Sequence, residues 1–365
     1  PSDSGAALLP GAFEVFRAAL RLAPRWLICG RTAPGAGEDA GAGLHGMFRT
    51  IAREYGDIAA RVVDLDPAAT AARRADFLLA ELYAEDRAPV VVRTEAGRYG
   101  YELVERGLAP TGAGLAGDGA AEAAALGLDQ DSVVVLVGGA RGIAADFAEA
   151  LAAASRCRIE RLGRTQLPAG PEDPELAGAA DATALRALLA ARGGRTPAAI
   201  EREVKNVLAG REVAHTLDRL RRLGSPAAYR VADMCDGAAG AQAVKEIQAE
   251  HGRIDVVVYA AGVIEDRLME EKDPESFRRV YATKVDGARA LLDAAAELPH
   301  GPLTAVLFGS VSAVLGNRGQ SDYAAANDAL ARVGERWARG TGRRALTVHW
   351  GPWAPSGVHS GMVTP

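Results

Sequence analysis

The feature that most constrains the fold is an apolar run followed at once by a glycine-rich turn. The run SVVVLV spans residues 132–137 and has the composition of a buried strand, and GGARGIA follows at Gly138–Ala144 and opens an apolar helix. Glycines let the backbone turn tightly and approach a pyrophosphate, which the N-terminus of the helix then stabilises. Glycine-rich turns are also common elsewhere, and Ala144 replaces the last glycine of the usual dinucleotide-binding pattern. A plain structural turn is an equal alternative for this segment alone.

Five more segments after the turn have strand composition, and helical patterns separate them, which indicates a parallel α/β fold. These segments are residues 158–162, 228–232, 254–260, 303–309 and 345–350. Roughly 65 residues separate the first two, about twice what one crossover helix needs. We therefore expect residues 166–227 to form an insertion with a long helix packed on the sheet.

A glycine- and alanine-rich stretch around Gly112–Ala125 has linker composition and divides the chain. We expect two Rossmann-like α/β lobes with parallel sheets, residues 1–125 including the linker and residues 126–365. The N-terminal lobe has a helical pattern over residues 44–55 and a strand over residues 61–65, and the C-terminal lobe ends in the same order.

The N-terminal lobe lacks the chemistry-bearing features of the other lobe. GRTAPG, and not a glycine-rich turn into a helix, follows its strand at residues 25–29. None of its tyrosines has an Asn or Lys four residues later. We expect this lobe to be truncated, structural and without a cofactor site.

The end of the second strand of the C-terminal lobe indicates the cofactor. An NAD-binding fold usually places a carboxylate here to hold the ribose hydroxyls, whereas this sequence reads Leu162-Gly163-Arg164-Thr165. A guanidinium pairs with a 2′-phosphate, and Arg141 in the glycine-rich turn can reach the same group. The pattern predicts NADPH, although both arginines also fit a solvated surface.

Two later segments complete the predicted cofactor site. Asp233 follows the third strand, where it can accept a hydrogen bond from the adenine amino group or form a turn, and small residues end the fourth strand. The candidate cofactor-binding residues are Gly138, Gly139, Arg141, Gly142, Ile143, Gly163, Arg164, Thr165, Asp233, Met234, Ala260, Ala261 and Gly262.

The segment FGSVSAVLGNRGQSDYAAAN, residues 308–327, carries the candidate catalytic groups. Ser310 ends a strand, Tyr323 begins a helix 13 residues later, Asn327 lies one helical turn further on, and Lys284 lies on the preceding helix. A hydride that arrives at a carbonyl carbon leaves an alkoxide, which needs a proton donor and a hydrogen-bond donor.

We expect Tyr323 to be the acid, with Ser310 as the donor to the developing oxyanion. A phenol has an ordinary pKa of about 10, and we expect the ammonium of Lys284 to lower it. Asn327 would hold a proton-relay water or Lys284 itself. Each residue also has a structural interpretation, as a core tyrosine, a strand-end serine or a surface lysine, but their joint order favours catalysis.

The sequence resembles the ketoreductase domains of type I polyketide and polyunsaturated fatty acid synthases, within the short-chain dehydrogenase/reductase superfamily. The motifs that carry the resemblance are GGARGIA, LGRT, AAGVIED, TKVDGA, GQSDYAAAN and WGPW. In ordinary members of the superfamily a lysine follows the tyrosine by four residues, whereas here Asn327 takes that position and Lys284 lies on the preceding helix, as in the synthase domains. The family also has an empty N-terminal lobe, and continues beyond WGPW with a lid and a last strand.

The resemblance implies reduction of a β-ketoacyl chain on the phosphopantetheine arm of an acyl carrier protein, beside neighbouring synthase domains. In the family an LDD-like triplet after AAGV orients the substrate; here it is Ile264-Glu265-Asp266, which retains Asp266. The opposite class carries a Trp eight residues before the tyrosine, where this chain has Leu315. We expect a D product, of the B type, unless the acidic stretch only caps the following helix.

Composition excludes several other classes. The net charge of −5 without basic blocks argues against nucleic acid, and no apolar run approaches the ~20 residues of a membrane span. Three distant cysteines fit a reducing cytoplasm, and the six histidines lack metal-ligand spacing, so we expect no metal. The start at Pro1 indicates a piece of a longer chain, monomeric when isolated. The alternatives are a non-catalytic scaffold domain and a free-standing dehydrogenase.

Overall fold

The computed structural model describes residues 8–32, 41–107, 119–138, 142–167, 170 and 172–353. Contacts divide the chain into two compact units, which do not follow the covalent order. The first contains residues 1–109, 234–245 and 256–351, and the second contains residues 110–233, 246–255 and 352–365. The predicted boundary between two lobes at residue 125 of the sequence therefore stays a prediction.

The first unit begins with a four-stranded sheet in the order β1-β2-β3-β4, in which β1, β2 and β3 are parallel and β4 is antiparallel. Its elements are α1 (Phe13–Arg21), β1 (Trp26–Thr32), α2 (Leu44–Glu54), β2 (Ala59–Leu65), α3 (Ala71–Leu82), β3 (Val90–Thr94) and β4 (Gly97–Gly100). The predicted helix and strands of this region are confirmed to within a few residues at each end, whereas β3 and β4 were not predicted. We call this region, residues 8–107, the N-terminal subdomain.

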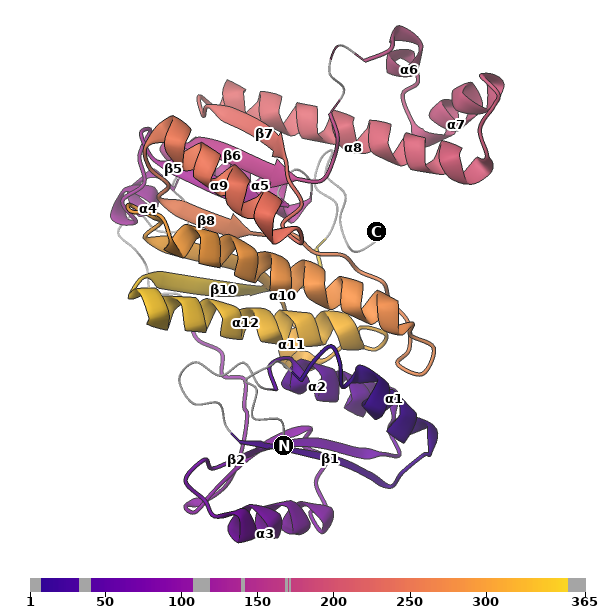
Figure 1. The fold of residues 1–365 in the computed structure, drawn as a ribbon, viewed down its shortest axis with the longest axis vertical. Coiled ribbons are helices and arrows are strands. Elements are labelled where there is room, and N and C mark those ends of the chain that lie inside the picture. The colour runs from indigo at the N-terminus through magenta and orange to yellow at the C-terminus, as the bar shows by residue number, and fades with distance from the viewer. Residues whose placement is uncertain are drawn as a thin grey trace. The chain divides into compact units, whose positions relative to one another are not determined.

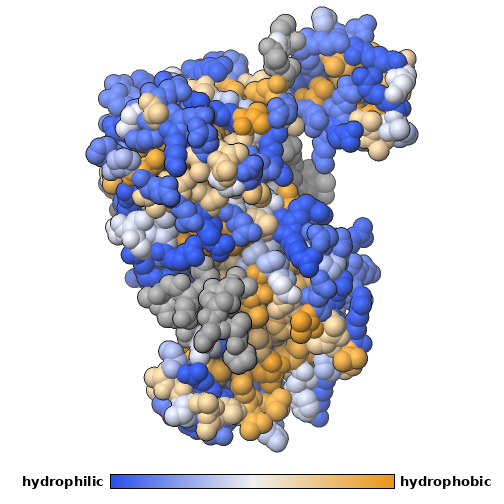
Figure 2. Space-filling view, in the orientation of Figure 1, coloured by the Kyte–Doolittle hydropathy of each residue, from blue (hydrophilic) through white to orange (hydrophobic). Residues whose placement is uncertain are grey.

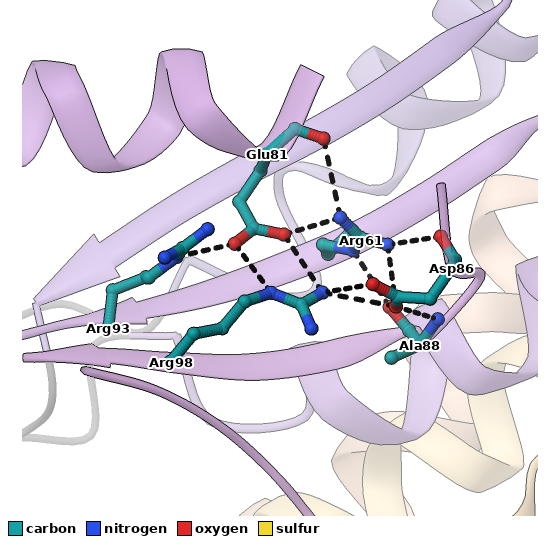
Figure 3. Close-up of polar contacts among 6 residues, drawn as sticks. All are labelled: Arg61, Glu81, Asp86, Ala88, Arg93 and Arg98. Carbon is teal, nitrogen blue, oxygen red and sulfur yellow. Dashed lines mark hydrogen bonds and ion pairs between the residues drawn. The ribbon is translucent and has the colours of Figure 1, made fainter. Parts of the chain in front are cut away.

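Buried ion pairs hold the N-terminal subdomain together beside its apolar core. Glu81, at the end of α3, is fully buried and accepts hydrogen bonds from Arg61, Arg93 and Arg98, which come from three neighbouring strands (Figure 3). Asp64 on β2 is also buried, and its carboxylate pairs with Arg31 and His45. Figure 2 shows hydrophobic side chains on the surface around α3 and β1, and Trp26 and Leu79 are among the exposed ones.

The rest of the first unit carries three parallel strands in the order β10-β9-β8. Its elements are β8 (Val256–Tyr259), α10 (Pro274–Ala296), β9 (Thr304–Ser310), α11 (Ser312–Leu315), α12 (Ser321–Thr341) and β10 (Arg344–Trp350). The start of α10 is set by local sequence, because Asp273 caps its N-terminus and Pro274 occupies the first turn. Helix α12 packs against both α10 and α2 (Figure 1).

The second unit contains the parallel strands β5, β6 and β7 in that order. Its elements are α4 (Ala120–Ala125), β5 (Val133–Val137), α5 (Ile143–Ser155), β6 (Arg158–Gly163), α6 (Pro174–Gly178), α7 (Ala182–Ala191), α8 (Pro197–Arg222) and β7 (Ala227–Val231). Helix α9 (Gly237–His251) is shared between the units. The parallel α/β class and the six predicted strands of the C-terminal lobe are confirmed.

The insertion at residues 166–227 contains the predicted long helix, α8, which contacts α5 and β7. Helix α7 does not pack on the sheet as expected for the insertion, but on α8, around a small core of their own. That core contains Ala179, Leu185, Leu189 and Val204. Among the helices that the structure describes, none has an apolar stretch long enough to span a bilayer.

Candidate active site

Parallel strands and two adjacent helices bring the predicted catalytic residues together. Ser310 is the last residue of β9, and Tyr323 and Asn327 lie in the first turns of α12. Lys284 comes from the middle of α10, and its Nζ lies 5.9 Å from the centre of the Tyr323 ring. Ala260, Ala261 and Gly262 follow β8, which pairs in parallel with β9, so they lie at the same edge of the strands as Ser310.

Lys284 is a buried ammonium, only 3 % exposed. Its Nζ donates a hydrogen bond to the carbonyl oxygen of Ala261 at 3.2 Å. Within the described part of the chain, no carboxylate lies within ion-pair distance of it. Burial lowers the pKa of Lys284 to about 8, because the low-dielectric surroundings disfavour the charged form.

Tyr323 is also buried, at 8 % exposure. Burial raises the pKa of Tyr323 above its ordinary value, the nearby Asn327 amide opposes this rise, and the Asp266 carboxylate adds to it. This direction is opposite to the lowering that the sequence led us to expect from Lys284. The phenol therefore stays protonated at neutral pH, in the form that a proton donor needs.

Asn327 is fully buried, and its amide connects to the backbone of the same helix. Its Nδ2 donates to the carbonyl oxygen of Tyr323 at 2.7 Å. Its Oδ1 has no hydrogen-bond partner among the described residues. A buried amide oxygen without a donor is costly, so Asn327 can accept one more hydrogen bond beside Tyr323 and Lys284.

His349 supports Ser310 and was not predicted. Its ring Nδ1 lies 3.0 Å from the carbonyl oxygen of Ser310, so the ring holds the end of β9 from β10. Burial lowers the pKa of His349, which favours the neutral ring with a proton on Nδ1. The sequence gives no signal for this contact, because His349 occupies an ordinary position in a strand.

The second unit carries most of the predicted cofactor residues. Gly138 and Gly142 both have positive φ, at 79° and 55°, which favours glycine, and Gly142 precedes Ile143 at the N-terminus of α5. No side chain caps this terminus, so its N–H groups suit an anion. Gly139 and Arg141, two of the predicted residues, lie outside the described residues.

Gly163 ends β6, with Arg164 and Thr165 directly after it. The side chain of Arg164 is 58 % exposed, and its Nη1 lies 3.8 Å from Asp233 Oδ2. Arg164, predicted to bind the 2′-phosphate, and Asp233, predicted to bind the adenine amino group, therefore lie beside each other. The glycine turn, the uncapped helix and the exposed guanidinium fit an anionic dinucleotide.

Asp266, the predicted substrate-orienting residue, lies in the exposed segment between β8 and α10. Its Oδ2 accepts a hydrogen bond from Gln320 Nε2 at 3.0 Å. The cap of α10 is Asp273, so Asp266 does not have the capping role that was its alternative. Met234, the remaining predicted cofactor residue, is buried before α9.

The N-terminal subdomain contacts the catalytic helix directly. Helix α2 packs on α12 so closely that a Cβ at Gly46 would lie 2.2 Å from the carbonyl oxygen of Ala324. Only glycine permits this approach. The backbone next to Tyr323 is therefore supported by a helix of the subdomain that has no predicted catalytic residue.

Comparisons with known proteins identify the family of the chain. The KR domain family matches residues 132–355. A polyunsaturated fatty acid synthase polypeptide of Thraustochytrium sp. is 37 % identical over 251 residues, which cover 65 % of this chain and 9 % of that protein. The spectinabilin polyketide synthase system protein NorB of Streptomyces orinoci is 36 % identical over 161 residues, 41 % of this chain and 7 % of that one. The chain thus spans only a small part of these relatives.

Solved structures show the same fold over nearly the whole chain. The ketoreductase PlmKR1, from the first module of phoslactomycin biosynthesis in Streptomyces sp. HK803, has a TM-score of 0.68 at 24 % identity. The comparison covers 97 % of this chain and 71 % of that one. The first ketoreductase of the tylosin polyketide synthase has a TM-score of 0.65 at 25 % identity, with 96 % and 65 % covered.

Proposed function

Because the chain belongs to the KR domain family of polyketide synthase ketoreductases, we propose that it reduces a β-ketoacyl thioester to the 3-hydroxyacyl thioester with NADPH. The observation that carries the proposal is the buried Lys284 5.9 Å from the Tyr323 ring, with a carbonyl oxygen and no carboxylate as its partner among the described residues. A scaffold domain has no need to retain a buried charge that lacks an oppositely charged partner.

In this mechanism the bound cofactor supplies the hydride. Tyr323 donates its phenolic proton to the substrate carbonyl oxygen, and Ser310 Oγ donates a hydrogen bond to the same oxygen as charge develops there. Lys284 stabilises the phenolate that Tyr323 becomes. Asn327 Oδ1 accepts from the water or ammonium that returns a proton to the tyrosine. His349 holds the backbone of Ser310 in place.

The preference for NADPH rests on Arg164. Its guanidinium is exposed at the end of β6, where a dinucleotide fold places the adenosine ribose. A guanidinium pairs with the 2′-phosphate, whereas a carboxylate would repel it. We propose that Gly138, Gly139, Gly142 and Ile143 hold the pyrophosphate. Arg141 would reach the 2′-phosphate together with Arg164, with Thr165 and Asp233 beside the adenosine.

The substrate is proposed to be carried by an acyl carrier protein within a synthase, since the relatives are multidomain synthases. The three cysteines support action in a reducing cytoplasm. We propose a D product, because Asp266 is retained on the segment after β8 and Leu315 stands where the opposite class has Trp. Chiral chromatography of the reduced thioester tests this: a mainly L product, or a racemate, would overturn it.

Tyr323→Phe tests the proposed reaction. The variant loses only the transferable proton, so reduction of a β-ketoacyl thioester should fall by about 10²-fold or more, while NADPH binding, followed by nicotinamide fluorescence, stays near that of the wild type. If the variant keeps more than about a tenth of the activity, Tyr323 is not the acid.

A further inference from the structure

Lys272 is a second buried lysine that the reaction described above does not use. It lies in the segment between β8 and α10, and its side chain is 0 % exposed. Its Nζ lies 2.8 Å from Oδ2 of Asp322, whose side chain is 1 % exposed. A fully buried charge is rarely retained without a role, because removing it from water is costly even when it is paired.

The two partners of Lys272 lie in two different segments, Glu265 in the segment between β8 and α10 and Asp322 in the first turn of α12. Its Nζ also donates to the carbonyl oxygen of Glu265 at 2.8 Å, next to Asp266. Asp322 directly precedes Tyr323, and its Oδ1 accepts from the Tyr323 backbone N–H at 2.8 Å. The ammonium of Lys272 thus connects the segment that carries Asp266 to the first turn of α12, which carries Tyr323.

Further hydrogen bonds connect the same two segments. The backbone N–H of Arg267 donates to the carbonyl oxygen of Gly319 at 3.0 Å. Glu54, at the end of α2, accepts from the backbone N–H groups of Met269 and Gly319, both at 2.8 Å. The N-terminal subdomain therefore holds both segments, and Lys272 closes the connection nearest to Tyr323.

We propose that Lys272 is a positioning residue: its ion pair with Asp322 and its bond to Glu265 set the position of Asp266 relative to Tyr323, and thereby the orientation in which the ketone is reduced. This inference rests on the proposed ketoreductase function. Lys272 acts through Asp322 and Glu265, and it does not replace Lys284, which lies beside the tyrosine ring.

The carboxylate of Glu265 is engaged elsewhere, which leaves its carbonyl for Lys272. Its oxygens accept from Ser276 Oγ at 2.5 Å and from Arg279 at 2.6 and 2.8 Å, both on α10. The Arg279 and Ser276 hydrogen bonds lower the pKa of Glu265 to about 2, so it stays ionised. Asp266, in contrast, is exposed, and its position depends on the backbone at Glu265 and on the single hydrogen bond from Gln320.

The test uses the double variant K272M/D322N, which removes both charges while keeping the size of both side chains. Replacing a buried pair by neutral groups together is often tolerated, whereas removal of one partner leaves a buried charge alone. The double variant is therefore expected to fold. K245M, which removes an exposed lysine from α9, is the matched control.

Hydrogen–deuterium exchange tests the connection without reference to activity. We expect exchange in residues 263–272 and 316–322 to be at least about tenfold faster in the double variant, with the N-terminal subdomain unchanged. Unchanged exchange in both segments would overturn the connection. If the double variant does not fold, K272Q/D322N carries the same readouts, because it also removes both charges and leaves no buried charge without its partner.

Product analysis then tests the effect on the reaction. A misplaced segment should cost roughly 10- to 100-fold in kcat and lower the D:L ratio, while KM for NADPH and all values for K245M stay as in the wild type. A double variant with faster exchange but an unchanged D:L ratio would contradict the positioning role. A wild type that reduces no β-ketoacyl thioester would instead refute the proposed function and leave the exchange result standing.

Discussion

Glu81 and Lys284 are both buried charged side chains of the same compact unit, but their surroundings differ. Glu81 accepts hydrogen bonds from three arginines (Figure 3). Burial alone would raise its pKa, yet the bonds from Arg98 and Arg93 hold the pKa below its ordinary value. Lys284 has a single carbonyl oxygen as its partner, and burial lowers its pKa to about 8.

The difference separates charges that hold the fold from charges that serve chemistry. A paired buried charge loses stability when one partner is removed. An unpaired buried charge already costs stability in the wild type, and is retained where a reaction needs it. The N-terminal subdomain and the catalytic helices should therefore respond in opposite ways to substitution.

Glu81→Leu should give the largest effect, because it leaves the buried guanidinium of Arg61 with only the half-exposed carboxylate of Asp86. We expect the free energy of unfolding to fall by about 3–5 kcal/mol, with kcat of the folded protein preserved. Urea unfolding measures the free energy, and ketone reduction at low temperature measures kcat. Glu95→Gln, which breaks the exposed pair with Arg73, should change stability by less than about 1 kcal/mol. A lower kcat at unchanged stability would break the comparison.

The pairings of Glu81 could not be predicted from the sequence, and of the strands that carry its partners only β2 was predicted, whereas β3 and β4 were not. An apolar strand pattern can be recognised from residues that are close in the sequence. The same holds for Tyr323 and Asn327, which lie four residues apart on one helix face. Pairings such as Glu54 with Gly319 join residues 265 positions apart and leave no periodic signal. The short strand β4 was missed for a related reason, since its residues GRYG lack an apolar pattern.

Arg164→Ala should have an intermediate effect, on the cofactor and not on the fold. Its exposed pair with Asp233 contributes little to stability, but a charge-assisted bond to the 2′-phosphate is worth roughly 1.5–3 kcal/mol. KM for NADPH should therefore rise by about 10- to 150-fold, and KM for NADH should hardly change. Equal increases for both cofactors would show that Arg164 does not contact the phosphate.

The pH dependence of the rate should report Lys284. The ammonium form, which stabilises the phenolate, is lost as the pH rises through about 8, so kcat/KM should fall by about tenfold per pH unit above that value. Tyr323 has a raised pKa and remains protonated over this range. An alkaline limb that begins only above about pH 10, the ordinary pKa of tyrosine, would assign the titration to the phenol.

The central claim is that Lys284 is a buried charge kept for chemistry at the expense of stability, and the unfolding free energy of Lys284→Met against the wild type tests it most directly. The folded pKa of about 8 lies below the ordinary 10.5, so between these values the unfolded wild type binds more protons and its stability rises with pH. Methionine has no such titration. At pH 7 the variant should be the more stable protein, and its advantage should shrink by about 1 kcal/mol per pH unit from pH 8 to pH 10. A variant that is less stable at pH 7, with a difference independent of pH, would show that Lys284 is a paired structural charge like Glu81.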